Sequence, residues 1–193
     1  MYIHVPSAWL SLMTFLIMTF YSIVGLAFKM PFGFIINKAV APIGAVFTLI
    51  CIITGSLWGK PMWGTWWVWD ARLTSVAILF IVYIIIIFIN YSFENIYVRE
   101  KISAIFILIG SINLPIIKFS VDWWNTLHQP ASIIKIGGPS IDDKMLLPLI
   151  LMFFALSFFS LYLIILNVKT KLIEKKCEAL LLKSNLEEIS KAG

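Results

Sequence analysis

The sequence predicts an all-α, polytopic integral membrane protein with five transmembrane helices. Hydrophobic residues make up 61% of the 193 positions and charged residues only 13%, whereas soluble domains have roughly 45–50% and about 25%. The mean hydropathy is +0.96. Five apolar stretches have or approach the length of about 20 residues with which a helix crosses a bilayer. These observations exclude a soluble globular domain.

None of the five stretches contains Asp, Glu, Lys, Arg or His, whose charged side chains would be costly in the hydrocarbon core. Pro6 and Ser7 suit the opening of the first helix. The fourth stretch is the shortest and carries Asn113 and Pro115, so we expect a kink there or an extension past Lys118. The expected spans are residues 7–28, 39–58, 73–90, 102–117 and 145–168.

The distribution of Lys and Arg predicts the topology. One side of the membrane carries ten of them, at 29, 38, 99, 101, 169, 171, 175, 176, 183 and 191, and the other carries five, at 60, 72, 118, 135 and 144. The richer side is expected to be cytoplasmic or matrix. The N-terminus, loop 59–72 and loop 118–144 then face outward. Residues 1–168 form the membrane domain, and 169–193 form an amphipathic inner tail with leucines among Lys and Glu.

Several function classes are excluded by composition. Cys51 and Cys177 form no CxxC or haem-attachment motif, so the chain is neither a thiol oxidoreductase nor a c-type cytochrome. The net charge of +5 is spread between apolar blocks, which does not indicate nucleic-acid binding.

The tryptophans and histidines all fall on the predicted outer face. Trp9 and Trp58 lie at the outer ends of their spans, which a simple aromatic belt explains. The other six Trp are in the outer loops, at 63, 66, 67, 69, 123 and 124. The chain has two histidines, His4 just before the first span and His128 in the outer loop 118–144.

Loop 59–72 is expected to contain a short helix that begins at Pro61. Its positions i, i+3, i+4 and i+7 would be Trp63, Trp66, Trp67 and Asp70. Such an indole-lined face suits a flat apolar ligand. A lipid-anchoring interfacial helix remains the alternative.

Loop 118–144 is expected to contain a second short helix. Ser120 and Asp122 are typical helix-start residues and Pro130 is a typical stop. This helix would place Trp124 and His128 one turn apart on one face.

The number of ligands favours haem over zinc. A structural zinc site needs about four protein ligands, and the outer face offers two histidines and no cysteine. Haem needs only one or two axial ligands. Its propionates would require cations, for which Lys60, Arg72, Lys118 and Lys135 are candidates. Plain surface solvation of these four remains the alternative.

Three segments resemble a known family. The string Trp58–Ser75 is similar to the tryptophan-rich WWD signature of haem-handling proteins, and the flanking segments Tyr2–Pro6 and Asp122–Gln129 resemble the histidine segments of one family. That family is the haem exporter protein C (CcmC) family of the system I cytochrome c maturation machinery.

The resemblance implies a haem-delivery factor rather than an enzyme. It implies non-covalent, b-type haem with His4 and His128 as axial ligands of the iron. It also implies a platform for haem and for a membrane-anchored haem chaperone, formed by Trp63, Trp66, Trp67, Trp69 and Asp70. Arg72, Trp123 and Trp124 complete the expected site.

The resemblance further implies partners and a place in the cell. The expected partners are the chaperone, the ABC transporter subunits of the maturation system and membrane lipid. The expected location is the bacterial or mitochondrial inner membrane. Family members usually have six spans, with one helix before the first histidine segment, so an upstream helix is expected to be missing here.

Two other functions stay open at this stage. A bis-histidine b-type electron carrier would use the same residues, although its haem normally lies between helices within the bilayer. A membrane scaffold would use the tryptophans only to dock protein partners. Assays of haem binding and of haem transfer distinguish the delivery factor, the electron carrier and the scaffold.

Overall fold

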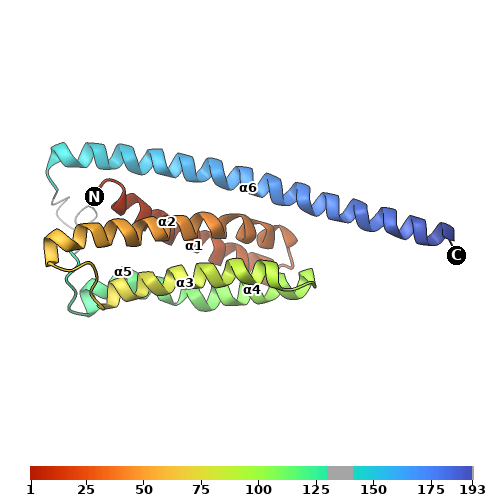
Figure 1. Ribbon diagram of the computed structural model, residues 1–193, viewed down its shortest axis with the longest axis horizontal. Helices are drawn as coiled ribbons and strands as arrows, with labels where there is room; N and C mark the ends of the chain where they lie inside the picture. The colour runs from red at the N-terminus through yellow and green to blue at the C-terminus, as the bar shows by residue number, and fades with distance from the viewer. Residues whose placement is uncertain (130–140, 193) are drawn as a thin grey trace.

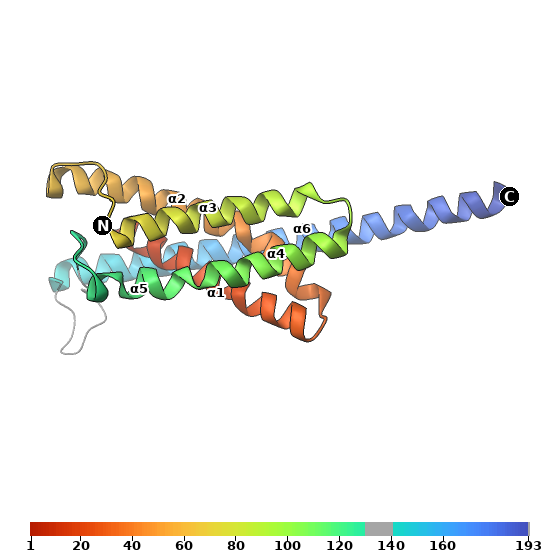
Figure 2. The same cartoon turned by 90° about the horizontal axis from the view of Figure 1, so that it is seen from below.

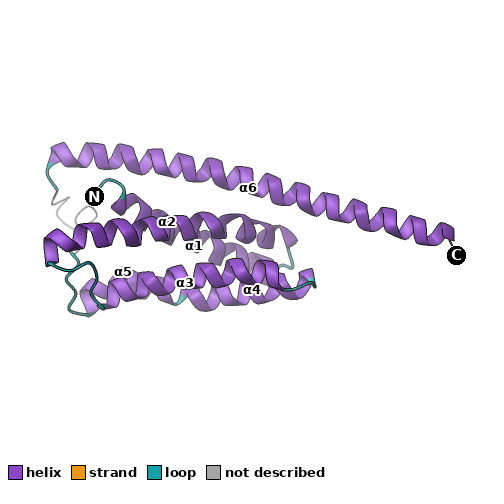
Figure 3. Ribbon diagram, in the orientation of Figure 1, coloured by secondary structure: helices purple, strands orange, loops and turns teal. Residues whose placement is uncertain are grey.

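The chain consists almost entirely of helix. The computed structural model describes residues 1–129 and 141–192, with side chains except at 182 and 185–192. Within that part there are six helices and no strand (Figure 3). They are α1 (His4–Ala27), α2 (Pro31–Trp63), α3 (Ala71–Ser92), α4 (Ile96–Ser111), α5 (Asn113–Trp123) and α6 (Asp143–Ala192).

Five helical stretches of the described part are long and apolar enough to cross a membrane. Four are α1, α2, α3 and α6, and the fifth is the 28-residue stretch Ile96–Trp123 that α4 and α5 form together. The helix is interrupted at Ile112, where the Asn113 side-chain amide donates to the Ser75 carbonyl of α3 at 2.8 Å. The predicted all-α, five-span membrane fold is confirmed, and the fourth span has the expected irregularity.

Two helices are much longer than the apolar stretches that predict them. α2 begins at Pro31, with extended backbone at Met30 and the proline in the first turn, eight residues before the expected start. α6 has 50 residues and continues without a break from the fifth span through the tail. It packs against α1 and α2 and extends beyond the other helices (Figure 1).

The core lies where α1, α2, α3 and α4 meet. Its fully buried side chains include Phe15, Met18, Val40, Leu79, Tyr83, Ile86 and Ile107. The buried Tyr83 hydroxyl donates to the Ser11 carbonyl at 2.8 Å and lies 2.9 Å from the Thr14 hydroxyl, so this polar group is paired. Gly44 leaves room for the Tyr83 ring, because a Cβ there would collide with it.

The connections between helices divide into two ends. The N-terminus, the α2–α3 connection, the end of α5 and the start of α6 lie together, whereas the α1–α2 and α3–α4 connections lie at the opposite end (Figures 1 and 2). We call the first the histidine end, defined by residues 1–4, 64–70 and 124–129. We call the second the far end, defined by residues 28–38 and 93–101.

Candidate functional site

His4 is held by the backbone of a neighbouring helix. It is the first residue of α1, not a residue before the span as the sequence suggested. Its Nδ1 lies 3.0 Å from the Cys51 carbonyl oxygen of α2 and 3.2 Å from the Thr54 hydroxyl. A carbonyl oxygen only accepts, so Nδ1 carries the proton and donates. The lone pair of Nε2 is then available to a metal.

Gly55 makes room for this imidazole. A Cβ at Gly55 would lie 2.9 Å from His4 Cε1, closer than real Cβ contacts. Trp58 also lies beside the imidazole of His4. The centroids of the two rings are 6.3 Å apart, and their planes meet edge-on at 66°. The hydrogen bond, the glycine and the indole together set the orientation of His4.

The predicted helix from Pro61 to Asp70 is wrong. Pro61 lies in the last turn of α2, which ends at Trp63, and Gly64 has a left-handed backbone with φ of 75°. Asp70 is extended, and its Oδ1 accepts the Leu73 amide proton at 2.8 Å as the N-cap of α3. Glycine tolerates positive φ at little cost and aspartate is a strong N-cap. These two local preferences outweigh the helical spacing of the tryptophans.

The tryptophans of the α2–α3 connection differ widely in exposure. Trp69 is 81% exposed and Trp66 54%. Lys60 lies over the Trp66 ring at 5.9 Å and donates to the Gly64 carbonyl at 3.0 Å. Trp67 is partly buried with its ring centroid 5.7 Å from that of Trp69. Trp63 contacts Gly59, where a Cβ would lie 3.0 Å from the indole.

Two buried polar atoms of this connection have no hydrogen-bond partner among the described residues. They are the Trp67 indole Nε1 and the Asp70 Oδ2. Buried polar groups are normally paired, so each unpaired group requires an explanation. A ligand with polar groups of its own would supply the missing partners.

Arg72 joins the start of α3 to the end of α5. Its Nε donates to the Ser120 hydroxyl at 3.2 Å, and its Nη2 donates to the carbonyls of Ile117 at 3.2 Å and Lys118 at 3.3 Å. Its Nη1 lies 3.1 Å from Nδ1 of His128. Arg72 therefore holds the His128 segment against the bundle, and much of its donor capacity is already used within the protein.

The predicted helix from Ser120 to Pro130 is also wrong. α5 ends at Trp123, Trp124 is extended, and residues 124–129 are not helical. Ser120 lies near the C-terminal end of α5 and donates to the Ile117 carbonyl, so it cannot cap a new helix. Trp124 and His128 are not one helical turn apart. Pro130 and Lys135 lie outside the described residues.

The Nδ1 atom of His128 has two competing partners. Gln129 offers a carbonyl oxygen at 2.9 Å, which requires a proton on Nδ1, whereas Arg72 can only donate and requires a lone pair there. The tautomer that donates to Gln129 leaves the Nε2 lone pair for a metal. Burial, together with the Arg72 charge, lowers the pKa of His128 despite the opposing Gln129 carbonyl and Asp70. The neutral imidazole is favoured, as metal binding requires.

Trp123 and Trp124 follow α5 and are 58% and 50% exposed. Trp123 stacks on Phe119 with ring centroids 5.4 Å apart, and Trp124 meets it edge-on at 5.8 Å. His4 begins α1, and His128 lies against Arg72 near the start of α3. The fold thus brings both histidines and both tryptophan segments to one end.

Sequence reasoning missed the residues that orient His4, which are Cys51, Thr54 and Gly55. An isolated glycine inside an apolar span often marks a close approach of another group, and that was the available signal for Gly55.

These features define an all-helical, multi-pass membrane protein in which two histidines and an aromatic cluster share one end. The profile of the family described as "Heme exporter protein C" matches residues 1–183. The chain belongs to this family, as the three sequence segments suggested.

Individual relatives agree with the family match. The chain is 45% identical over 180 residues to "Heme exporter protein C" of Bradyrhizobium diazoefficiens, covering 93% of this chain and 68% of that protein. It is 50% identical over 173 residues to a "Putative cytochrome c biosynthesis ccmC-like mitochondrial protein" of Marchantia polymorpha, covering 89% and 72%. It is 42% identical over 175 residues to "Heme exporter protein C" of Haemophilus influenzae, covering 91% and 71%.

Proposed function

We propose that this chain binds haem at the histidine end and delivers it to a membrane-anchored haem chaperone during cytochrome c maturation. The observation that carries the proposal is that the chain's two histidines lie at the same end of the helix bundle, His4 at the start of α1 and His128 beside Arg72 of α3. Each has a protein acceptor for its Nδ1 proton, which leaves Nε2 for iron. The names of the relatives, which refer to haem export and cytochrome c biosynthesis, support the same function.

His4 and His128 are the proposed axial ligands of a non-covalently bound, b-type haem. The exposed rings of Trp66, Trp69 and Trp124 offer apolar surface to a flat ring system. The unpaired Trp67 Nε1 can donate to a propionate. We propose that Arg72 positions His128 and does not bind a propionate, because its donor groups already face acceptors within the protein.

The proposed role is delivery of haem rather than catalysis. The excess of Lys and Arg on the side of the far end supports a cytoplasmic or matrix far end and an outer histidine end. The exposed Trp69 suits a surface that a partner covers, and we propose that this partner is the chaperone. The ABC transporter subunits of the maturation system are the further proposed partners, in a bacterial or mitochondrial inner membrane.

The test is the absorption spectrum of the detergent-purified chain reconstituted with haem. We expect a low-spin spectrum that is lost in His4→Gly and in His128→Gly and is restored by added imidazole, which replaces the missing ligand. Tyr2→Phe, two residues before His4 in the chain and without a proposed role, is the control and should keep the wild-type spectrum.

The outcomes separate the three functions. A wild-type chain that binds no haem when haem is supplied would favour the scaffold. Haem that binds and cycles between redox states but never transfers to a purified chaperone would favour the electron carrier. Transfer to the chaperone that depends on both histidines supports delivery.

A further inference from the structure

A second polar site lies at the far end, away from both histidines. A cavity of about 40 Å³ opens between α2, α3, α4 and α6. This is room for a few water-sized groups. Four Lys or Arg side chains and three Glu side chains line it. A cavity with both signs of charge, at the ends of membrane-spanning helices, lies at the level where lipid headgroups are found.

Two residues that line this cavity each carry a buried polar atom without a partner among the described residues, Asn37 its Oδ1 and Ser103 its Oγ. Asn37 is 2% exposed and Ser103 3%. The Asn37 Nδ2 group donates to the Ser22 hydroxyl at 2.8 Å, so the free atom is the acceptor oxygen. A buried acceptor without a partner is costly, and it calls for a donor from the occupant of the cavity.

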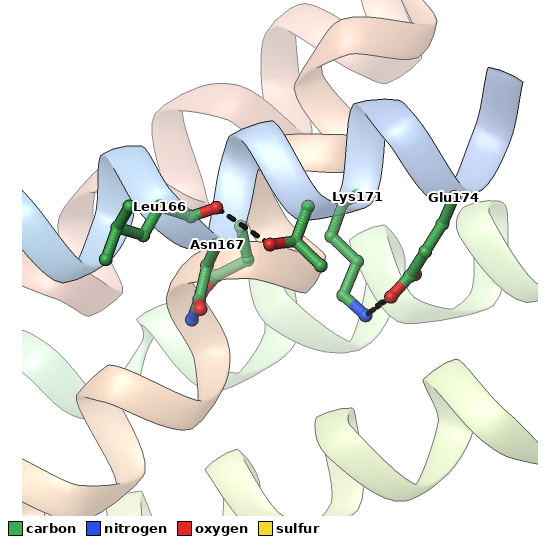
Figure 4. Close-up of polar contacts among 6 residues, drawn as sticks. Leu166, Asn167, Lys171 and Glu174 are labelled. Atoms are coloured by element: carbon green, nitrogen blue, oxygen red, sulfur yellow. Dashed lines mark hydrogen bonds and ion pairs between the residues drawn. The ribbon is translucent and has the colours of Figure 1, made fainter.

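The charges that line the cavity are only partly paired. Lys171 binds Glu174 at 2.8 Å along α6 (Figure 4), and Lys175 approaches Glu100 at a longer 3.9 Å. Lys38 lies over the Tyr91 ring at 5.4 Å. Within the part of the chain that the structure describes, no carboxylate lies within 4 Å of Lys38 or Arg99. These two cations repel each other, and the carboxylates of Glu100, Glu174 and Glu178 offset only part of that repulsion. An anionic group between them would relieve this repulsion.

A larger cavity, of about 210 Å³, adjoins the first and shares Lys38, Asn90 and Lys171 with it. Three of its other lining residues lie nearer the middle of their spans, Pro42 on α2, Ile87 on α3 and Asn167 on α6, whereas Tyr91 and Thr170 lie at the level of the shared residues. Asn167 also donates to the Ala39 carbonyl at 3.1 Å, which holds α6 beside α2 at this level. The polar cavity therefore continues into a less charged one in the direction of the hydrocarbon core.

We propose that the two cavities together bind one phospholipid with an amine-bearing headgroup, phosphatidylethanolamine. Its phosphate lies between Lys38 and Arg99. Its ammonium group donates to Asn37 Oδ1 and to the Glu100 carboxylate, and its glycerol and upper acyl carbons occupy the larger cavity. Phosphatidylcholine has no N–H to donate to Asn37, and an acidic headgroup such as that of phosphatidylglycerol has no ammonium group and brings a further negative charge beside Glu100, Glu174 and Glu178. This inference does not depend on haem binding.

The test uses the full chain purified in detergent and analysed by native mass spectrometry. We expect one phosphatidylethanolamine to remain bound to the wild type. The double variant Lys38→Gln, Arg99→Gln removes two charge-assisted contacts and should weaken binding about tenfold or more. Lys101→Gln, an exposed cation on α4 that does not line the cavity, is the control and should bind lipid as the wild type does. Arg99→Lys keeps the charge, so retention of lipid there separates loss of the site from loss of the fold.

The headgroup is tested by the thermal stabilisation that added lipids produce. Phosphatidylethanolamine should raise the melting temperature more than phosphatidylcholine or phosphatidylglycerol, and Glu100→Gln should reduce this preference. Equal stabilisation by the three lipids would overturn the assignment of the amine. Equal stabilisation by soluble phosphoethanolamine would show that the larger cavity holds no lipid, and a wild type that retains no phospholipid would overturn the site.

Discussion

Gly55→Ala tests whether the orientation of His4 controls haem binding. A methyl group at this position would lie 2.9 Å from His4 Cε1, whereas ordinary contacts begin at 3.4 Å. The ring must therefore move, and an ordinary contact requires a shift of 0.5 Å. That movement disturbs the 3.0 Å hydrogen bond from His4 Nδ1 to the Cys51 carbonyl.

The expected effect on haem is large and the expected effect on folding is small. Changes to groups that orient a metal-ligating histidine typically weaken binding about 10–100-fold, and we expect a loss in this range. In the haem-free variant, the gain of about 0.5–1 kcal/mol from replacing glycine by alanine inside a helix opposes the cost of disturbing one hydrogen bond, about 0.5–1.5 kcal/mol. The melting temperature of the haem-free variant should therefore stay close to that of the wild type. A large loss of haem affinity with little change in stability distinguishes a local displacement from general damage.

The assay is a haem titration followed by absorbance, together with a thermal melt of the haem-free protein. Ser56→Ala, the next residue of α2, is the matched control and should match the wild type in both measurements. A Gly55→Ala variant with wild-type haem affinity and spectrum would refute the assignment of His4 as a positioned ligand. A variant that loses both affinity and helical content would refute the argument that the change is local.

Three further predictions concern stability. Arg72→Gln removes hydrogen bonds to Ser120, His128 and two carbonyls of α5, so we expect a loss of about 2–4 kcal/mol in the free energy of unfolding by chemical denaturation; no loss would show that α5 is held by other contacts. Because the pKa of His128 is lowered in the folded state, the unfolded chain binds more protons, and the stability of the haem-free protein should fall as the pH drops below about 6.5, less steeply in His128→Gln; parallel pH profiles would contradict this. Tyr83→Phe leaves the buried Ser11 carbonyl and Thr14 hydroxyl without this partner and should cost about 1–3 kcal/mol in the same assay, with exposed Tyr97→Phe as the unchanged control.

Most of the fold could be predicted because membrane insertion depends on local composition. A hydropathy value is taken over about 20 neighbouring residues, so it does not depend on tertiary contacts, and it identified all five spans. Boundaries were less accurate where charged residues lie in a helix without ending it, as at Lys38 of α2 and from Lys169 onward in α6. There the helix is continued by its own hydrogen bonds and, in α2, by packing, which hydropathy does not measure.

The sequence predicted which residues belong to the candidate site better than it predicted how those residues are arranged. The resemblance of three segments to one family selected His4, His128 and the tryptophans, and the family match confirms that resemblance. The two short helices drawn from spacing were wrong, because Gly64 and Asp70 end and begin helices there and Ser120 lies near the end of α5. Periodicity is weak evidence over ten residues, where one glycine or one cap decides the backbone.

The sequence by itself determined that this is a membrane protein, how many helices span the membrane, and which segments lie at the same end of the helix bundle. These properties follow from apolar length and from the parity of the crossings. Only the tertiary structure decided which groups orient the histidines and what lies at the far end. His4 is held by a carbonyl 47 residues away, Arg72 reaches His128 across 56 residues, and Asn167 reaches Ala39 across 128. Contacts between distant residues depend on how helices pack, and no local pattern in the sequence encodes them.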